Sequence, residues 1–299
     1  MEKWEQIAKE FFPKEFDGFK RSLVDGRRPN SVTFTTIEED VLRRDLTINA
    51  LFFDLDTSEV VDLVGGVEDL KNGIIRTVGD ASERFEEDRL RIMRTIRFLC
   101  RFDGILSKDI KITLIQDSEL FGISAERIRD EFLKGLKSAK SVVRFIDMLD
   151  TFELFKWIFP TMEINKKFIE EKDHIVLIAT LLKNNDISTV SSRLNKLTHP
   201  ASDINKICFL LNLKSLEDIN NVVQLKKSFI KSGISSDQLR NFGSREGILS
   251  QLLDAFEEFE LTVNGDEVMK EFNLKPSKEL GDKIRELETN NFKKLLDMA

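Results

Sequence analysis

The spacing of apolar positions changes near residue 80 of this 299-residue chain. Before that point the apolar residues form short runs, and the runs at 51–55 and 59–64 flank a polar turn. Two such runs around a short turn are typical of a β-hairpin. A glycine turn with a short helix is predicted at 65–73, and a further strand at 74–78. Residues 37–53 are predicted to begin as a helix and to run into the first strand of the hairpin.

Beyond residue 82, apolar residues recur at helical spacing almost to the end of the chain. The strongest pattern covers 82–102, which is predicted as a single helix, and Ser124 is placed to cap the next helix, at 123–136. The last segment, 261–299, is predicted to form two short helices closed by a longer one. Further helices are predicted at 1–12, 141–155, 172–184, 189–197, 204–212, 215–230 and 247–260.

These patterns together predict a mainly α fold with a small α/β head. The predicted division is a head at 1–80, a helical neck at 81–138, a helical body at 139–240 and a helical tail at 241–299. A chain of this length is long enough for two or more such parts.

Composition narrows the class of protein. The net charge of −7 argues against a chain coated for nonspecific binding of nucleic acid, although a local basic surface is compatible with it. No apolar run is long enough to span a bilayer, so no membrane association is expected. Two cysteines in apolar surroundings are predicted to be buried, reduced thiols, which favours the cytoplasm. The two histidines lie far apart and lack ligand spacing, so no metal site is predicted on them.

The helix predicted at 82–102 carries a row of polar residues that could bind a ligand. Asp88 is followed at helical spacing by Arg91, Arg94, Arg97 and Arg101. A carboxylate accepts hydrogen bonds and a guanidinium donates several, so the pair of Asp88 and Arg91 can match the edge of a base while the later arginines face phosphates. The alternative is a solvated helix face with weak ion pairs, which the residues alone favour slightly.

A second polar cluster precedes the hairpin. Arg43, Arg44, Asp45 and Asn49 stand directly before an apolar strand, and such side chains can bind phosphates and ribose hydroxyls. The alternative is that the arginines compensate the dipole at the end of a helix. The glycine pair at 65–66 allows close approach of a backbone, but a simple loop is the favoured interpretation there.

Four motifs follow one another between residues 43 and 132: "RRDLTINA", "DLVGGVEDL", "EDRLR" and "SAERIRDEF". Their order and spacing resemble those of the class II tRNA nucleotidyltransferase and bacterial poly(A) polymerase family. The segment at 263–287 looks like the tail of CCA-adding enzymes, which favours CCA addition over poly(A) synthesis.

The resemblance implies roles for the two clusters. Asp88 and Arg91 would be the protein template that pairs with incoming CTP or ATP. Arg94 and Arg97 would hold the nucleotide, mainly by its phosphates. Arg44 and Asn49 would also bind it, and Asp45 would sense the ribose 2′-hydroxyl. Arg127 and Glu131 would support the templating helix, and the helical body and tail would hold tRNA.

The resemblance also implies Mg²⁺, held by two aspartates on a strand that follows a Gly-Gly turn. This sequence contains no such stretch, and Asp54 and Asp56 match it in letters only, because they fall at the hairpin turn. Glu15, or Asp17, is the candidate for the family's third carboxylate, and no metal ligand is assigned. We therefore expect a second polypeptide, or a further segment, to complete the head and to bring the catalytic carboxylates.

Three functions stay open at this point. The first is a cytoplasmic tRNA nucleotidyltransferase that adds CMP and AMP, from CTP and ATP, once its head is completed. The second is a catalytically inactive protein that binds nucleotides or tRNA. The third is a poly(A) polymerase. Retention of Asp88 with Arg91 favours preserved nucleotide binding over a mere scaffold.

Overall fold

The computed structural model describes residues 22–23, 29–31, 36–167 and 170–298. The helix predicted at 1–12 and the candidates Glu15 and Asp17 lie outside these residues. The chain forms two compact units, Met1–Arg84 and Phe85–Ala299. The four-part division into head, neck, body and tail stays a prediction.

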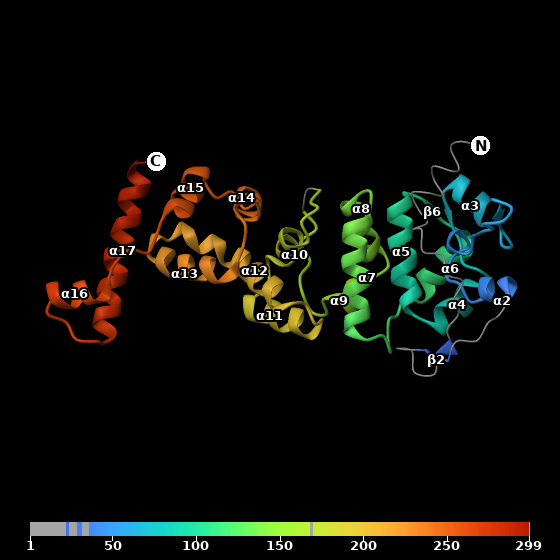
Figure 1. Cartoon of the computed structure of the whole chain (residues 1–299), viewed down its shortest axis with the longest axis horizontal. Helices are drawn as coiled ribbons and strands as arrows, with labels where there is room; N and C mark the ends of the chain where they lie inside the picture. The colour runs from blue at the N-terminus through green and yellow to red at the C-terminus, as the bar shows by residue number, and fades with distance from the viewer. Residues whose placement is uncertain (1–21, 24–28, 32–35, 168–169, 299) are drawn as a thin grey trace. The chain divides into compact units, whose positions relative to one another are not determined.

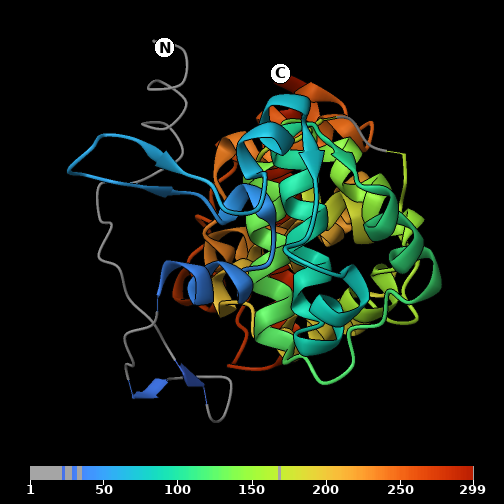
Figure 2. The ribbon, with the colours of Figure 1, turned by 90° about the vertical axis from the view of Figure 1, so that its right-hand side faces the viewer.

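The first unit contains short strands and helices. Its elements are β1 (Ser22–Leu23), β2 (Pro29–Ser31), α2 (Ile37–Leu42), η1 (Thr47–Asn49), β3 (Phe52–Phe53), β4 (Val60–Val61), α3 (Gly66–Asn72) and β5 (Ile74–Ile75). Strands β1 and β2 pair antiparallel, and so do β3 and β4, which confirms the predicted hairpin (Figure 2). A small core of the buried side chains Val41, Ala50 and Val78 lies where α2, the end of η1 and the segment after β5 meet, with Phe52 and Val64 packed against it.

The helix predicted to begin at residue 37 ends at Leu42, earlier than the pattern suggests. The following segment forms a turn and the short 3₁₀ helix η1. The cause is the Asp45 side chain, which accepts a hydrogen bond from the backbone N–H of Leu46 at 2.9 Å. A short acidic side chain that takes a backbone donor in this way competes with helix formation.

Helices make up almost all of the second unit, which confirms the mainly α fold (Figure 1). They are α5 (Leu90–Phe102), α6 (Lys108–Gln116), α7 (Ala125–Ser138), α8 (Val142–Thr151), α9 (Phe155–Ile158), α10 (His174–Leu182), α11 (Ile187–Lys196), α12 (Ala201–Asn212), α13 (Val222–Ser232), α14 (Ser236–Arg245), α15 (Ser250–Glu258), α16 (Gly265–Glu271) and α17 (Lys278–Met298), with α4 (Ala81–Glu87) at the boundary between the units. Strand β6 (Ile105–Leu106) and two 3₁₀ turns, η2 (Leu213–Glu217) and η3 (Ile219–Asn221), complete the unit.

Helix α5 packs side by side with α7 and α8 (Figure 1). Ser124 caps α7 as predicted, because its side chain accepts a hydrogen bond from the backbone N–H of Arg127. Gly135 of α7 lies so close to Phe145 of α8 that an added Cβ would come within 2.0 Å of the ring. This contact holds the C-terminal half of α7 firmly against α8.

The structure differs from the predicted helices at further points, including α6, which was not predicted, and the helix predicted at 215–230, which is η2, η3 and α13. The single helix at 82–102 is two helices, α4 and α5, interrupted at Asp88 and Arg89. Helix α14 was not predicted, because its sequence is mostly polar. It is held by a capping box between Ser235 and Gln238 and by burial of only a few side chains. The tail has one short helix, α16, before the long α17. None of the helices that the structure describes could cross a membrane by length and apolarity.

Candidate functional site

Arg44 is fixed in place by the end of helix α2. Its guanidinium contacts the Asp40 carboxylate at 2.9 Å and donates to the carbonyl of Asn49 at 2.6 Å. The Phe52 ring lies beneath it, 4.7 Å from the guanidinium carbon. Burial pushes the pKa of Asp40 upward, but hydrogen bonds from Arg43 and Arg44 outweigh it, so this pKa lies below its usual range. Asp40 is therefore a negative charge that orients Arg44.

Asp45 and Asn49 lie next to Arg44, so the structure brings together the three residues predicted in this segment. One Asp45 oxygen accepts a hydrogen bond from the Asn49 side-chain amide at 3.1 Å. The backbone of Asp45 also accepts from Val78 N at 3.2 Å. These bonds fix the orientation of both side chains before any ligand arrives.

The glycine turn at 65–66 packs against the segment that carries Arg44, Asp45 and Asn49. An added Cβ at Gly66 would lie only 2.2 Å from the carbonyl oxygen of Thr47, so this close approach is to the chain's own backbone. Asp62 accepts hydrogen bonds from three backbone N–H groups of the turn, at Val64, Gly66 and Val67. The interpretation of this segment as a simple loop therefore did not foresee that the turn supports the backbone at Thr47. The glycine pair was the signal in the sequence that could have indicated this close approach.

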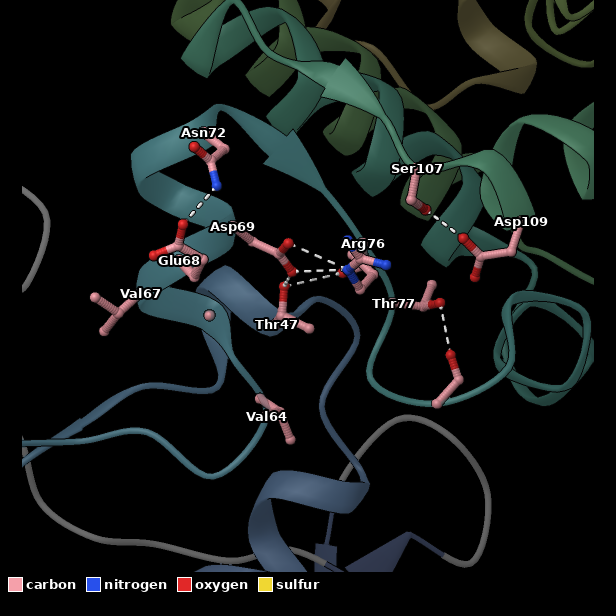
Figure 3. A network of polar contacts seen from close by, with 12 residues as sticks. Thr47, Val64, Val67, Glu68, Asp69, Asn72, Arg76, Thr77, Ser107 and Asp109 are labelled. Atoms are coloured by element: carbon pink, nitrogen blue, oxygen red, sulfur yellow. Dashed lines mark hydrogen bonds and ion pairs between the residues drawn. The ribbon is translucent and has the colours of Figure 1, made fainter.

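A network of hydrogen bonds, buried at Thr47 and Asp69, continues from Thr47 to the exposed Arg76 (Figure 3). The Thr47 hydroxyl donates to Asp69 at 2.7 Å, and Asp69 also accepts from Arg76 Nε at 3.0 Å. Thr47 N donates to the Arg76 carbonyl at 2.9 Å. Sequence reasoning did not identify Thr47, Asp69 or Arg76. Their hydrogen bonds form only where two segments that lie more than twenty residues apart in the sequence meet.

Replacing Gly66 by alanine is expected to destabilise the chain by about 1–3 kcal/mol, because the new methyl group would overlap the Thr47 carbonyl. Chemical denaturation would measure the change. Gly281→Ala in α17 is the matched control, since no atom lies within 4 Å of its added Cβ. Equal stability of the two variants would contradict the close packing at Gly66.

The second group of predicted residues surrounds the start of α5. Asp88 lies in the break before the helix, and its Oδ1 accepts a hydrogen bond from Leu90 N at 3.1 Å. Its Oδ2 accepts from the Arg127 guanidinium of α7 at 2.7 Å. Arg91 N donates to the Asp88 carbonyl at 2.9 Å, so the two residues stay one turn apart despite the break. Arg91 in turn pairs with Glu87 at 2.6 Å.

Arg94 and Arg97 both face Glu131 of α7. Arg97 Nε donates to Glu131 at 2.7 Å, and only 9% of the Arg97 side chain is exposed. The Arg94 guanidinium lies 3.9 Å from the same carboxylate, with 34% of its side chain exposed. Lys134 adds a third cation at 3.1 Å. Glu131 is thus a buried anion that orients two arginines, and of those two, Arg94 is the more accessible.

The described residues do not fit a Mg²⁺ site. Among them, no group of three or more His, Cys, Asp or Glu side chains is placed to hold a metal ion. The Asp54 carboxylate accepts hydrogen bonds from the backbone N–H groups of Asp56 and Thr57, as expected for a hairpin turn. The prediction that a second polypeptide, or a further segment, brings the metal-binding carboxylates stays untested.

Comparison with known proteins identifies the family. Residues 17–76 match the poly A polymerase head domain, and residues 116–165 match a domain described as the probable RNA and SrmB-binding site of polymerase A. The CCA-adding enzyme of Ligilactobacillus salivarius is 33% identical over 288 residues, which cover 88% of this chain and 70% of that enzyme. The chain belongs to the CCA-adding enzyme family. The CCA-adding enzyme of Lactobacillus helveticus is 32% identical over 286 residues, covering 88% of this chain and 71% of the relative.

Solved structures of CCA-adding enzymes share the fold. The Bacillus stearothermophilus enzyme in complex with CTP has a TM-score of 0.65 at 23% identity, covering 90% of this chain and 76% of that one. The Thermotoga maritima enzyme complexed with tRNA has a TM-score of 0.57 at 21% identity, covering 88% and 73%. The predicted family, a nucleotidyltransferase, and the predicted mainly α fold are therefore confirmed. The roles of the individual site residues stay predictions.

Proposed function

We propose that this chain adds CMP and AMP, taken from CTP and ATP, to the 3′ end of tRNA. The names of its relatives support the reaction, and solved relatives are described as complexes with CTP, with ATP and with tRNA. The observation that carries the proposal is the arrangement at the start of α5, where Asp88 and Arg91 lie one helical turn apart and Arg127 holds the carboxylate.

Asp88 and Arg91 would read the base. Each carboxylate oxygen of Asp88 already accepts one hydrogen bond within the chain and keeps a second lone pair for a base amino group. Arg91 offers guanidinium donors to the acceptor atoms of the same base edge. A fixed acceptor beside a fixed donor discriminates between bases, because a wrong base leaves polar groups unpaired.

The other arginines would position the rest of the nucleotide. Arg94, partly exposed, suits the phosphates, whereas Arg97 is buried and would act mainly by keeping α5 and α7 in register through Glu131. Arg44 would add a further phosphate contact. Asp45 and Asn49, already oriented by each other, would bind the ribose hydroxyls.

We further propose that the reaction requires Mg²⁺ and that its carboxylate ligands lie on a second chain or on a segment outside this sequence. The sequence lacks the family's Gly-Gly and paired-aspartate motif, which supports this part of the proposal. The reduced thiols predicted from the sequence favour a cytoplasmic location.

The test is incorporation of labelled CTP and ATP, with Mg²⁺, into tRNA that lacks its 3′ end. The expected result is incorporation only after a polypeptide carrying the missing motif is added. Incorporation by this chain alone would refute the need for a second polypeptide. Nucleotide binding without incorporation in either case would instead favour the inactive binding protein, and unlimited A addition to varied RNAs would favour a poly(A) polymerase.

A further inference from the structure

Helix α7 contacts two different parts of the second unit at once. Arg127 and Glu131, one turn apart, both lie on the side of α5, where Arg127 holds Asp88 just before that helix and Glu131 holds Arg97 within it. Arg129 lies between them in sequence, and two residues correspond to about 200° around a helix, so its side chain leaves α7 on the other side. Through Arg129, helix α7 can therefore connect the nucleotide-templating residues with the helices on its other side.

Arg129 reaches the corner between α11 and α12, made by Leu197, Thr198 and His199. Its guanidinium donates to the Thr198 hydroxyl at 2.7 Å, to the Thr198 carbonyl, and at 3.5 Å to the Leu197 carbonyl. Asp130 orients the guanidinium from the side at 2.6 Å. A cation at the carbonyl end of a helix is also stabilised by the helix dipole.

The α11–α12 corner is a firm anchor. Leu197 is fully buried and His199 nearly so. Backbone hydrogen bonds of 2.8–3.0 Å run from Leu197, Thr198 and His199 back into α11. Arg193 fastens α11 in turn, because it donates to the carbonyls of Ile158 and Trp157 at 2.7 and 2.6 Å.

The two halves of α7 are therefore held by different contacts. The C-terminal half is fixed by the tight packing of Gly135 on Phe145. The N-terminal half, which carries Arg127, packs on α5, and Arg129 joins its other side to the corner. Without Arg129, the side of this half that faces away from α5 loses its contact with the corner, so Arg127 is held less firmly relative to Asp88.

We propose that Arg129 is a positioning residue for base selection, which fixes α7 against the α11–α12 corner so that Arg127 can hold Asp88. It touches no nucleotide and acts through Arg127. The inference rests on the proposed function, because it assumes that Asp88 and Arg91 read the base.

The test is equilibrium binding of CTP, ATP, GTP and UTP to the full chain. Arg129→Met is expected to lower the preference for CTP and ATP over GTP and UTP about tenfold, equivalent to about 1.4 kcal/mol. Arg129→Lys, which keeps one charged donor, is expected to restore part of that preference. Lys226→Met is the matched control, because it removes a cation that donates to carbonyls at the end of another helix, α15, and it should leave the preference unchanged.

A double variant separates this role from a general loss of structure. If Arg129 acts through Arg127, then Arg127→Met combined with Arg129→Met should be no less selective than Arg127→Met alone. Additive losses, or an unchanged preference in Arg129→Met, would overturn the inference while leaving the proposed function intact. A wild-type chain that binds all four nucleotides equally would overturn the proposed function, and this inference with it.

Discussion

Replacing Asp88 by alanine is expected to reduce discrimination of CTP and ATP against GTP and UTP by about 10²-fold or more, since a site built from fixed polar groups draws its selectivity from them. The carboxylate is the acceptor half of the proposed template, and Arg127 holds it at 2.7 Å. Alanine removes this acceptor, so only the donor half of the template, Arg91, can still contact the base. Competition binding with the four nucleotides measures the change directly and does not require a catalytically complete enzyme.

Arg101→Met is the matched control for this experiment. Arg101 lies in the last turn of α5, at the opposite end of that helix from Asp88, which precedes its first turn. If the Asp88 and Arg101 variants lost selectivity equally, the effect would belong to the helix as a whole, and the template assignment would be wrong. If neither lost it, base selection would have to reside elsewhere in the chain.

Removing the Glu131 carboxylate is expected to have the largest effect on stability, about 3–5 kcal/mol, because it leaves a buried charge without compensation. Only 3% of the Glu131 side chain is exposed, and its partner Arg97 is almost as deeply buried. Glu131→Ala would therefore leave the Arg97 guanidinium buried beside a cavity. Urea unfolding, followed by far-UV circular dichroism, gives the free energy of unfolding for each variant.

Two comparisons sharpen this prediction. Glu286→Ala, which breaks an exposed pair with Lys283, should change stability by less than about 1 kcal/mol. A double variant in which both Glu131 and Arg97 become methionine should be less destabilised than Glu131→Ala, because the buried guanidinium is removed together with its partner. A Glu131→Ala variant as stable as Glu286→Ala would show that Arg97 finds another partner or reaches water.

Local sequence patterns were sufficient for the family, the hairpin and most helices. The hairpin follows from two apolar runs around a polar turn, and the Ser124 cap follows from a hydroxyl directly before an apolar helical repeat. Asp88 and Arg91 are three residues apart, so their neighbourhood depends only on the geometry of one turn. The two residues remain neighbours even though the predicted helix is interrupted at Asp88.

The contacts that support the site could not be read from the sequence in the same way. Arg127 meets Asp88 across 39 residues, and Glu131 meets Arg97 across 34. Gly66 meets Thr47 only because α3 packs against η1. A charged residue has many candidate partners of the opposite sign along a chain that is 33% charged, and packing alone selects one of them. The chemical groups of the site are thus local properties of the chain, whereas their orientation comes from helices that pack together from distant segments.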